Sequence, residues 1–488
     1  MKVNDIPFPV VGVGASAGGL EAFTLLLQHL PVDTGMSFVL VQHLDPAHES
    51  ALTKLLSKAT RMPVREITNN TPVEPNRVHI IPPNTSLTIS KGVLKLRPRK
   101  KADGLHRPID HFFHSLAEDQ HERGISVILS GTASDGTVGC EAIKAEGGIT
   151  FAQDESAKYD SMPRSAIAGG CIDFVLSPEE IAKELARIAR HPYVLGNSGD
   201  EPITSHDVEE SLPYAPKVRQ TKGGSKEGPF NKILTLLRNS TGVDFSLYKP
   251  NTINRRITRR TALGKAKTLD AYLRDLKNDA TELDALYQDL LISVTGFFRN
   301  PEAFEVLKRK VFPTILKNRS HNDLTRVWVL GCSTGQEAYS IAMSYLELAG
   351  KKNSNLPLQI FATDLNDSLL EKARAGFYAK NLVHDLPSER LRRFFVEENG
   401  GYRISKSIRE MCVFARQNLI TDPPFSRMDL ISCRNLMIYL EPALQKMIIP
   451  TFHYSLKPNG FLFLGASESV GANCDLFATV DKKHKVYA

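Results

Sequence analysis

The sequence has few cysteines and no long apolar run. Its 6 cysteines are scattered, and none lies in a CxxC pair or at the Cys/His spacing of a zinc site. The longest apolar stretches fall well short of the roughly 18 residues that a membrane-spanning helix needs. The first residues also lack the charged and apolar regions of a secretory signal. These absences exclude a disulfide-stapled or membrane-inserted protein, and they favour reduced thiols and a cytoplasmic location.

The charge balance is only mildly basic. The chain has 61 Lys and Arg against 54 Asp and Glu, a formal net charge of +7. This excess favours an acidic partner but is too small to indicate nucleic acid. The length of 488 residues is about three times that of a typical domain of roughly 150 residues. We therefore expect two or three separate hydrophobic cores.

The chain divides at a polar segment, residues 196–229, which is rich in Gly, Pro and Ser and has no hydrophobic period. We interpret it as a linker. Before it, in residues 1–195, short β-branched runs alternate with helical stretches, a pattern typical of a parallel sheet. Residues 230–318 have a helical period throughout. Strand–helix alternation returns in residues 319–488. The predicted fold is two α/β domains joined by a linker and a small all-helical subdomain.

A serine follows the first predicted strand. Residues 14–18, GASAG, match G-x-S-x-G between a strand and a helix, the setting of a nucleophile elbow. Gly12, Gly14 and Gly18 also fit a phosphate-binding loop, with Asp45 as the acid that would bind a ribose. His43 and Asp135 follow two further predicted strands, whose carboxyl ends share one edge of a parallel sheet. Ser16, His43 and Asp135 are therefore candidates for a catalytic triad. The residues alone leave both interpretations open.

The first 190 residues or so resemble the catalytic domain of the chemoreceptor methylesterases, the CheB type. The resemblance rests on the motifs GASAGG, QHLDP, SGTASDGTVG and MPRSA, which occur in this order. It implies that Ser16, His43 and Asp135 hydrolyse glutamyl methyl esters of chemoreceptors. One departure is the loop before the acid, GTASDG at residues 131–136, where the family often has GMGxDG.

A second glycine-rich loop follows a strand in the last third of the chain. Gly331 and Gly335 would let the backbone approach a ligand closely. Asp364 ends the next predicted strand and is suited to accept hydrogen bonds from both hydroxyls of a ribose. NAD and S-adenosylmethionine sites share this layout, so the loop and the acid do not decide between the two cofactors.

Residues 230–488 resemble the chemoreceptor methyltransferases, the CheR type. The resemblance rests on VTGFFRNP, GCSTGQEAYS, FATDLN, ARAGFY, NLITDPPF and SCRNLMIYL. It implies a Rossmann-like class I methyltransferase domain with a small β-subdomain near residues 384–412. It also implies S-adenosylmethionine as cofactor, S-adenosylhomocysteine as product, and no metal. The implied cofactor-binding residues are Gly331, Gly335, Gln336, Asp364, Asn418, Arg434 and Asn435.

Two further residues are candidates for the methyl-transfer step itself. A glutamate is already a carboxylate at neutral pH, so methyl transfer to it needs alignment and desolvation rather than proton abstraction. We expect Arg299 to orient the acceptor carboxylate and Tyr439 to line the transfer path. Gln336 stands where the family usually has the first Glu of GEE, which keeps a hydrogen-bonding side chain but removes a charge.

Two patterns have a structural as well as a functional interpretation. Residues 255–260, RRITRR, form either a solvated helix face or a surface that docks an acidic receptor helix, and we favour docking. Nucleic acid is disfavoured there because no aromatic residues are interleaved. His111 and His114 have a spacing that suits a metal, but no third ligand is visible, so we expect ordinary packing.

The sequence therefore predicts a bifunctional chemotaxis enzyme, a protein-glutamate methylesterase joined to a protein-glutamate O-methyltransferase. The expected partner is a methyl-accepting chemoreceptor, with no nucleic acid and no direct membrane insertion. Because the two activities oppose each other, an alternative is a signalling scaffold in which only one half is catalytic and the other binds receptor or cofactor.

Overall fold

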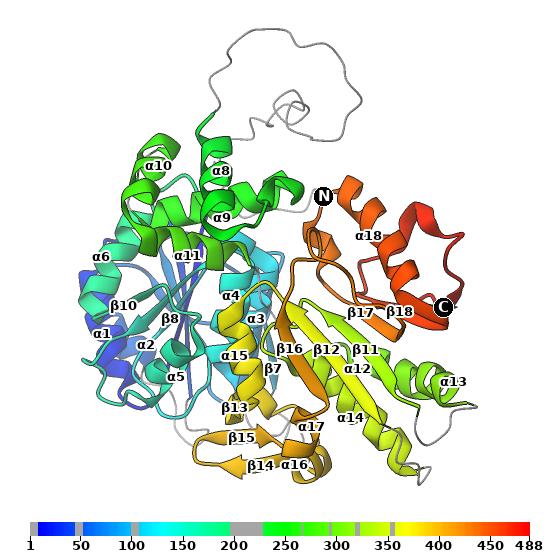
Figure 1. The fold of residues 1–488 in the computed structure, drawn as a ribbon. Coiled ribbons are helices and arrows are strands. Elements are labelled where there is room, and N and C mark those ends of the chain that lie inside the picture. The colour runs from blue at the N-terminus through cyan, green and yellow to red at the C-terminus, as the bar shows by residue number, and fades with distance from the viewer. Residues whose placement is uncertain are drawn as a thin grey trace, which may run out of the picture. The chain divides into compact units, whose positions relative to one another are not determined.

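The computed structural model describes residues 8–43, 52–98, 107–195, 228–264, 266, 268–291, 295–317, 323–351 and 357–488. The chain forms two compact units (Figure 1). The first comprises Met1–Ile233 and Arg255–Asp279, and the second comprises Leu234–Asn254 and Ala280–Ala488. Asp45 and residues 196–227 of the expected linker lie outside the described residues.

A seven-stranded sheet, with every pairing parallel, forms the centre of the first unit, in the order β10-β9-β8-β1-β2-β5-β3. Its central strands are buried along nearly their whole length because helices cover both faces. One face packs on α1 and α6, and the other on α3 and α4. The parallel sheet predicted from the alternating pattern is confirmed. The strands are β1 (Val10–Ala15), β2 (Ser37–Gln42), β3 (Val64–Glu66), β5 (Arg77–Ile80), β8 (Gly124–Ile128), β9 (Ile149–Gln153) and β10 (Phe174–Leu176).

The remaining elements of this part of the chain cover that sheet. A small antiparallel sheet has the order β4-β7-β6. Its strands are β4 (Thr71–Pro72), β6 (Thr85–Ser90) and β7 (Val93–Pro98). The helices are α1 (Gly19–His29), α2 (Leu52–Leu56), α3 (Pro108–Gln120), α4 (Thr137–Ala145), α5 (Ser161–Gly169) and α6 (Pro178–Ile188), with a 3-10 turn at His121–Arg123.

The arginine-rich run lies on helix α9 (Pro250–Leu263), and from Arg255 onward this helix belongs to the first unit. Arg256 and Arg259 are only 2% and 0% exposed. Arg256 donates to the backbone carbonyls of Lys144 and Ala145 at the end of α4. Arg259 donates to the carbonyl of Gly148 at 3.0 Å and forms an ion pair with Asp173. The prediction of an exposed face, whether solvated or docked to a receptor, is therefore wrong for these two side chains. Both are buried in the first unit and form hydrogen bonds within it.

A second seven-stranded sheet, in the order β16-β12-β11-β17-β18-β20-β19, forms the centre of the second unit. The pairings from β16 to β18 are parallel, and those of β20 with β18 and β19 are antiparallel. This is the predicted Rossmann-like arrangement. The strands are β11 (Thr325–Leu330), β12 (Leu358–Asp364), β16 (Cys412–Arg416), β17 (Met428–Cys433), β18 (Leu456–Leu464), β19 (Thr479–Asp481) and β20 (Val486–Tyr487).

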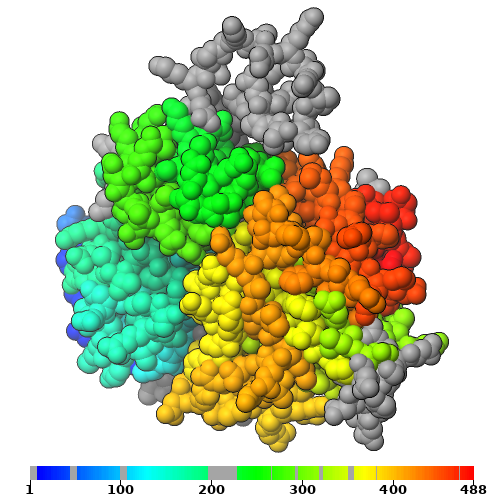
Figure 2. All heavy atoms as spheres, in the orientation of Figure 1, coloured from blue at the N-terminus to red at the C-terminus, as the bar shows by residue number. Residues whose placement is uncertain are grey.

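A three-stranded antiparallel sheet, in the order β13-β15-β14, adds the predicted small β-subdomain. Its strands are β13 (Phe377–Ala379), β14 (Phe395–Glu398) and β15 (Gly401–Ile404). In the space-filling view its atoms lie at the molecular surface, in yellow to orange (Figure 2). Phe377 and Val396 are 37% and 55% exposed there.

Helices make up the chain between the expected linker and the second large sheet, and residues 255–279 of this region belong to the first unit. The helices before that sheet are α8 (Pro229–Thr241), α9, α10 (Leu269–Asn278), α11 (Ala280–Leu290), α12 (Pro301–Val306) and α13 (Phe312–Leu316), with a π-helical turn at Leu307–Val311 and a 3-10 turn at Phe245–Leu247. The later helices are α14 (Gln336–Lys351), α15 (Asp367–Ala375), α16 (Ser388–Phe394), α17 (Lys406–Arg409) and α18 (Pro442–Ser455), with 3-10 turns at Lys380–Val383, Met437–Tyr439 and Gly471–Asn473. Among the described residues, no helix combines the length and apolarity needed to cross a membrane.

Candidate active sites

Ser16 lies in the turn between β1 and α1, as the G-x-S-x-G pattern predicts. Gly18, the residue before the helix, has φ 75°, a left-handed conformation that glycine adopts without a Cβ clash. Ser130, at the end of β8, holds this turn in place. Its carbonyl accepts from the Ser16 N–H at 3.0 Å, and its Oγ donates to the carbonyl of Ala17 at 2.9 Å. The nucleophile candidate is therefore fixed by hydrogen bonds from the neighbouring strand end.

The three candidate triad residues lie within reach of one another. Ser16 Oγ is 3.3 Å from His43 Nδ1, and His43 Nε2 is 2.8 Å from Asp135 Oδ2. Because an ionised carboxylate only accepts, Nε2 carries the proton toward Asp135 and Nδ1 is left to accept from Ser16. Asp135 is 3% exposed at its side chain and His43 is 29% exposed. This is the order of contacts that a nucleophile, a general base and an orienting acid require.

The start of α3 holds Asp135 in place. The N–H of Ile109 donates to Asp135 Oδ2 at 3.0 Å, and the N–H of Asp110 donates to Oδ1 at 2.9 Å. The first N–H groups of a helix have no partner within the helix, and the helix dipole favours a negative charge there. These donors were missed from the sequence, although Pro108 at the first helical position marks the helix start that supplies them.

The glycines of the alternative phosphate loop have a packing role. Gly12 and Gly14 belong to strand β1 rather than to a loop. A Cβ on Gly12 would lie 2.7 Å from a ring carbon of Phe113, and one on Gly14 would lie 2.5 Å from Ile109. Both glycines thus allow α3 to pack closely on the sheet. This observation favours the triad over the dinucleotide interpretation.

The MPRSA motif reaches the nucleophile through Met162. A Cβ on Gly131 would lie 2.9 Å from Met162 Sδ and 3.1 Å from Ser16 Cβ. Gly131 thus lies between the two, and a larger residue at this position of the GTASDG loop would require Met162 to shift.

The packing expected of His111 and His114 is wrong, because both residues lie at exposed positions of α3. The side chain of His114 is 65% exposed, and its Nε2 is 3.6 Å from Glu118. Within the described ranges, no group of three or more His, Cys, Asp and Glu side chains is placed to hold a metal ion.

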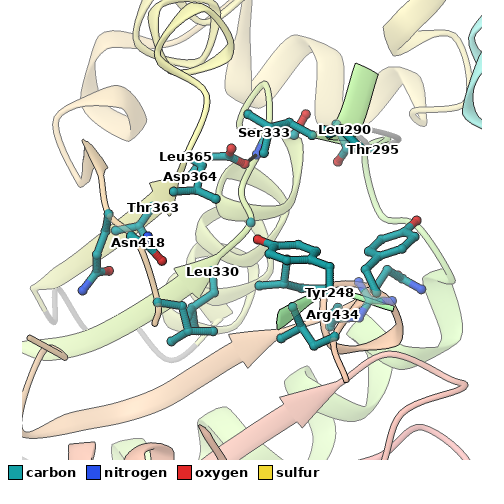
Figure 3. Close-up of a pocket in the computed structure, with 18 of the residues that line it drawn as sticks. Tyr248, Leu290, Thr295, Leu330, Ser333, Thr363, Asp364, Leu365, Asn418 and Arg434 are labelled. Atoms are coloured by element: carbon teal, nitrogen blue, oxygen red, sulfur yellow. Dashed lines mark hydrogen bonds between the residues drawn. The ribbon is translucent and has the colours of Figure 1, made fainter. Parts of the chain in front are cut away.

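A pocket in the second unit lies at the carboxyl ends of β11, β12 and β17 (Figure 3). Such strand ends are where open α/β sheets bind their ligands. Its lining includes predicted site residues together with residues that the sequence reasoning did not single out. The predicted ones are Arg299, Gly331, Asp364, Asn418, Arg434, Asn435 and Tyr439. Others include Tyr248, Thr252, Leu290, Thr295, Ser333, Glu337, Thr363, Gln417 and Ile420.

Gly335 and Gln336 do not line this pocket. Gln336 is 3% exposed, and its Oε1 accepts from Thr334 Oγ1 at 2.6 Å. Gly335 has φ 90°, and a Cβ there would lie 3.0 Å from Ala373. Both residues shape the loop, and a direct part in cofactor binding stays a prediction.

Asp364 is the central acid of the pocket. Its Oδ2 accepts from the Ser333 N–H at 2.8 Å, and its Oδ1 accepts from the Asn366 N–H at 3.0 Å. Burial raises the pKa of Asp364, and these N–H groups oppose that shift. With three backbone donors in all, the four lone pairs of the carboxylate leave capacity for a ligand hydroxyl. Two other lining atoms, Ser333 Oγ and Gln417 Oε1, are buried without a hydrogen-bond partner, so a polar ligand would satisfy them.

The guanidinium of Arg434 forms hydrogen bonds with neighbouring residues of the pocket wall. Its Nη1 donates to Glu337 at 3.1 Å, and its Nη2 donates to the carbonyl of Arg299 at 2.9 Å and to Asn300 at 3.0 Å. Its side chain is 2% exposed. Glu337, the last residue of GQE, therefore lines the pocket as an acid held by Arg434. The sequence signal that could have indicated Glu337 was its place in the glycine loop.

Glu468 holds the loop that carries several lining residues. Its carboxylate accepts from the backbone N–H groups of Asn435, Leu436, Met437 and Gly465. Asn435 has φ 57°, which this arrangement maintains. Glu468 is 4% exposed. No pattern in the sequence indicated this residue, because Asn435, Leu436 and Met437 lie about 30 positions earlier in the chain.

Family models match the chain in the order that its sequence motifs predict, with a methylesterase domain first and the two methyltransferase domains after it. Residues 11–185 match the family model of the CheB methylesterase. Residues 229–291 match the all-alpha domain of the CheR methyltransferase, and residues 293–486 match its SAM binding domain.

Individual relatives cover either most of the chain or one half of it. A Rhodobacter capsulatus protein described as an uncharacterized 104.1 kDa protein is 38% identical over 441 residues, 89% of this chain. The chain spans 46% of that relative's length. A chemotaxis protein methyltransferase of Listeria innocua is 33% identical over 235 residues, which are 48% of this chain and 87% of that protein. Among solved structures, the Thermotoga maritima CheB methylesterase catalytic domain is 29% identical in sequence to this chain, with a TM-score of 0.35. The match covers 37% of this chain and 98% of the crystallised chain.

Proposed function

Because this chain belongs to the CheR family of chemotaxis methyltransferases and carries a CheB methylesterase domain before it, we propose that it both adds and removes methyl groups on glutamate side chains of a chemoreceptor. The observation that supports this most is the pairing of two different sites in one chain. One is a hydrogen-bonded Ser–His–Asp set, and the other is a pocket at strand ends lined by acids.

In the proposed esterase reaction, Ser16 Oγ attacks the carbonyl carbon of the glutamyl methyl ester. His43 takes the Ser16 proton at Nδ1 and returns it to the departing methoxide, so that methanol leaves. Water then attacks the acyl-enzyme, again through His43, and releases the glutamate. The N-terminus of α1 supplies a positive dipole end next to the developing oxyanion. Asp135 stabilises the imidazolium that forms in both steps.

The residues of the pocket fit S-adenosylmethionine, the proposed cofactor of the transferase half. This molecule combines a ribose diol, an adenine, an amino-acid end and a sulfonium cation. Asp364, at the end of β12, is proposed to accept hydrogen bonds from the ribose hydroxyls. Glu337 and Arg299 offer charges of opposite sign for an amino-acid end, and Leu290 and Ile420 offer apolar surface for a ring. The unpartnered Ser333 Oγ and Gln417 Oε1 fit a polar ligand of this kind.

When bound, the cofactor supplies an activated methyl group, and its product is S-adenosylhomocysteine. The chain's own residues have to bring a glutamate carboxylate into line and exclude water, because no proton must be removed. Arg299 is proposed to orient that carboxylate. Tyr439 is proposed to line the path between the two reactants. Replacing either residue should reduce methyl transfer more than cofactor binding.

The test uses the full chain with a receptor cytoplasmic fragment and tritiated S-adenosylmethionine, following incorporation of label and then release of methanol. The expected result is incorporation by the wild type, with methanol release abolished in Ser16→Ala. The matched control is Ser57→Ala, which changes an exposed serine of the same unit. Incorporation without release, even from the wild type, would favour the scaffold alternative with one silent half. No incorporation would contradict the transferase proposal.

A further inference from the structure

A second carboxyl group lies beside the triad acid. Asp110 is in the first turn of α3, and its backbone N–H donates to Asp135 Oδ1. The same Asp135 accepts from Ile109 and from His43 through Oδ2. The negative charge of Asp135 is thus supported by two N–H groups and an imidazole.

Fewer groups would stabilise a negative charge on the side chain of Asp110. Its Oδ1 accepts from the N–H of Gly139 in α4 at 2.9 Å. Its Oδ2 is buried and has no hydrogen-bond partner, and Arg107 Nη1 lies 3.7 Å away, beyond hydrogen-bonding distance. The side chain of Asp110 is 12% exposed. An ionised carboxylate with an unpartnered buried oxygen is costly.

Ionising two neighbouring buried carboxyl groups together costs much free energy, because the like charges repel each other. One of the two therefore keeps a proton near neutral pH. Asp135 has more donors and is the one that retains the charge. Burial, and then the negative charge of Asp135, raise the pKa of Asp110 from 3.8 to about 8.

We propose that Asp110 is a positioning residue of the esterase site that carries a proton at neutral pH while Asp135 carries the charge. Loss of this proton to solvent would place a second negative charge beside Asp135. Repulsion would then push Asp135 away from His43 and disfavour the oxyanion, so ester hydrolysis should fall at alkaline pH. This inference rests on the proposed esterase function.

Two charged groups act directly on Asp110: Asp135, which lies before α4, and Arg107, which lies before α3. His43, after β2, contacts Asp135. Arg107 favours the ionised form of Asp110 and Asp135 opposes it. Removing the Arg107 charge should therefore raise the pH at which Asp110 releases its proton.

A titration that does not depend on activity tests the proton directly. Full-length protein labelled with ¹³C at aspartate side chains is followed by NMR from about pH 5 to about pH 10. We expect a carboxyl resonance that titrates near pH 8 in the wild type, is missing in Asp110→Asn, and shifts to higher pH in Arg107→Gln. Glu118→Gln, which removes a 71% exposed carboxylate from the same helix, should leave that resonance unchanged. A wild-type spectrum in which no aspartate titrates above about pH 6 would overturn the proposal, whether or not Asp110→Asn folds.

The second arm measures methanol release from a glutamyl methyl ester peptide, with Ser16→Ala subtracted as background. If only the protonated form of Asp110 supports hydrolysis, the wild-type rate should fall about tenfold between about pH 7 and about pH 9. Asp110→Asn cannot ionise, so its ratio of rates at the two pH values should stay near one. Equal pH profiles in the two proteins would overturn the positioning role. A wild type that releases no methanol would instead contradict the esterase proposal, and the NMR titration alone would then decide on the Asp110 proton.

Discussion

Both α/β units place a candidate site at the carboxyl ends of parallel strands, but the two sites contain different chemical groups. In the first unit, Ser16, His43 and Asp135 form one chain of contacts along which a proton can move. In the second unit, none of the described residues that line the pocket is a histidine, lysine or cysteine. Ester hydrolysis needs a proton carrier, whereas methyl transfer to a carboxylate does not. The same sheet edge can therefore serve opposite reactions when its loops carry different side chains.

The substitution Asp135→Asn is expected to have the largest effect on one site while leaving the other intact. An asparagine would favour the wrong tautomer of His43, so methanol release should fall about 10⁴-fold. Methyl incorporation should be unaffected, because the transferase pocket contains no such relay. Stopped assays of methanol release and of tritium incorporation on the same preparation measure both. Asp33→Asn, an exposed change in the same unit, serves as the control, and a loss below tenfold would show that Asp135 is not the triad acid.

The second prediction concerns Glu468, which supports the transferase loop. In Glu468→Gln an amide NH₂ would face backbone donors, so about two charge-assisted hydrogen bonds would be lost, or about 4 kcal/mol of local stability. Hydrogen exchange should rise in residues 434–440, and methyl transfer should fall while methanol release persists. Glu410→Gln, at a 64% exposed side chain, is the matched control. Unchanged exchange in that loop would show that the four N–H contacts do not hold it.

A third prediction distinguishes the two units by their response to acid. His79 on β5 is 3% exposed, both its ring nitrogens are unpartnered, and burial lowers its pKa from 6.5 to about 4. Between these values the unfolded chain binds a proton that the folded chain does not bind. Stability is therefore complete above pH 6.5 and is lost as the pH falls toward 4, by about 3 kcal/mol in total.

Hydrogen exchange of peptides from β2 and β5, measured at about pH 7 and about pH 5, checks this prediction. Protection in these strands should weaken on acidification in the wild type and much less in His79→Phe. His29→Gln, at an exposed histidine, should behave like the wild type. Equal acid sensitivity in the wild type and His79→Phe would assign the effect to other groups.

The smallest expected effect is that of Asp364→Asn on cofactor binding. Replacing the charged acceptor weakens hydrogen bonds to the ribose hydroxyls, so the Kd for S-adenosylmethionine should rise about 30-fold, or about 2 kcal/mol. Equilibrium dialysis with labelled cofactor measures this, and methanol release should not change. Asp367→Asn, three residues later and 66% exposed at its side chain, is the control. An equal Kd in Asp364→Asn and the control would remove Asp364 from the cofactor site.

The arginine helix shows where reasoning from sequence failed. Six residues with four arginines indicate an exposed face, yet Arg256 and Arg259 are spaced by one helical turn and share a buried side. Their acceptors, among them Ala145 for Arg256 and Asp173 for Arg259, lie more than 80 positions away in the chain. Helical periodicity gives the spacing, but it does not say which face another element covers.

The supporting shell of each site was hidden for the same reason. The backbone N–H groups of Ile109 and Asp110 hold Asp135, and Glu468 holds the loop at Asn435. Such contacts depend on how the chain folds back: Pro108 marks the start of α3, but it does not indicate that Asp135 lies against these N–H groups. A buried carboxylate such as Asp110 also cannot be recognised as protonated until its neighbours are known.

The sequence by itself determined the alternation of strands and helices, the two glycine-containing turns and the motifs that place Ser16, His43, Asp135 and Asp364 at strand ends. Local patterns suffice there because parallel strands bring their carboxyl ends to one edge. Only the tertiary structure decided that Gly12 and Gly14 admit a helix, that Arg434 braces Glu337, and that Asp110 lies beside Asp135. Those outcomes depend on burial and on contacts between distant segments, and these set the charge and position of each group.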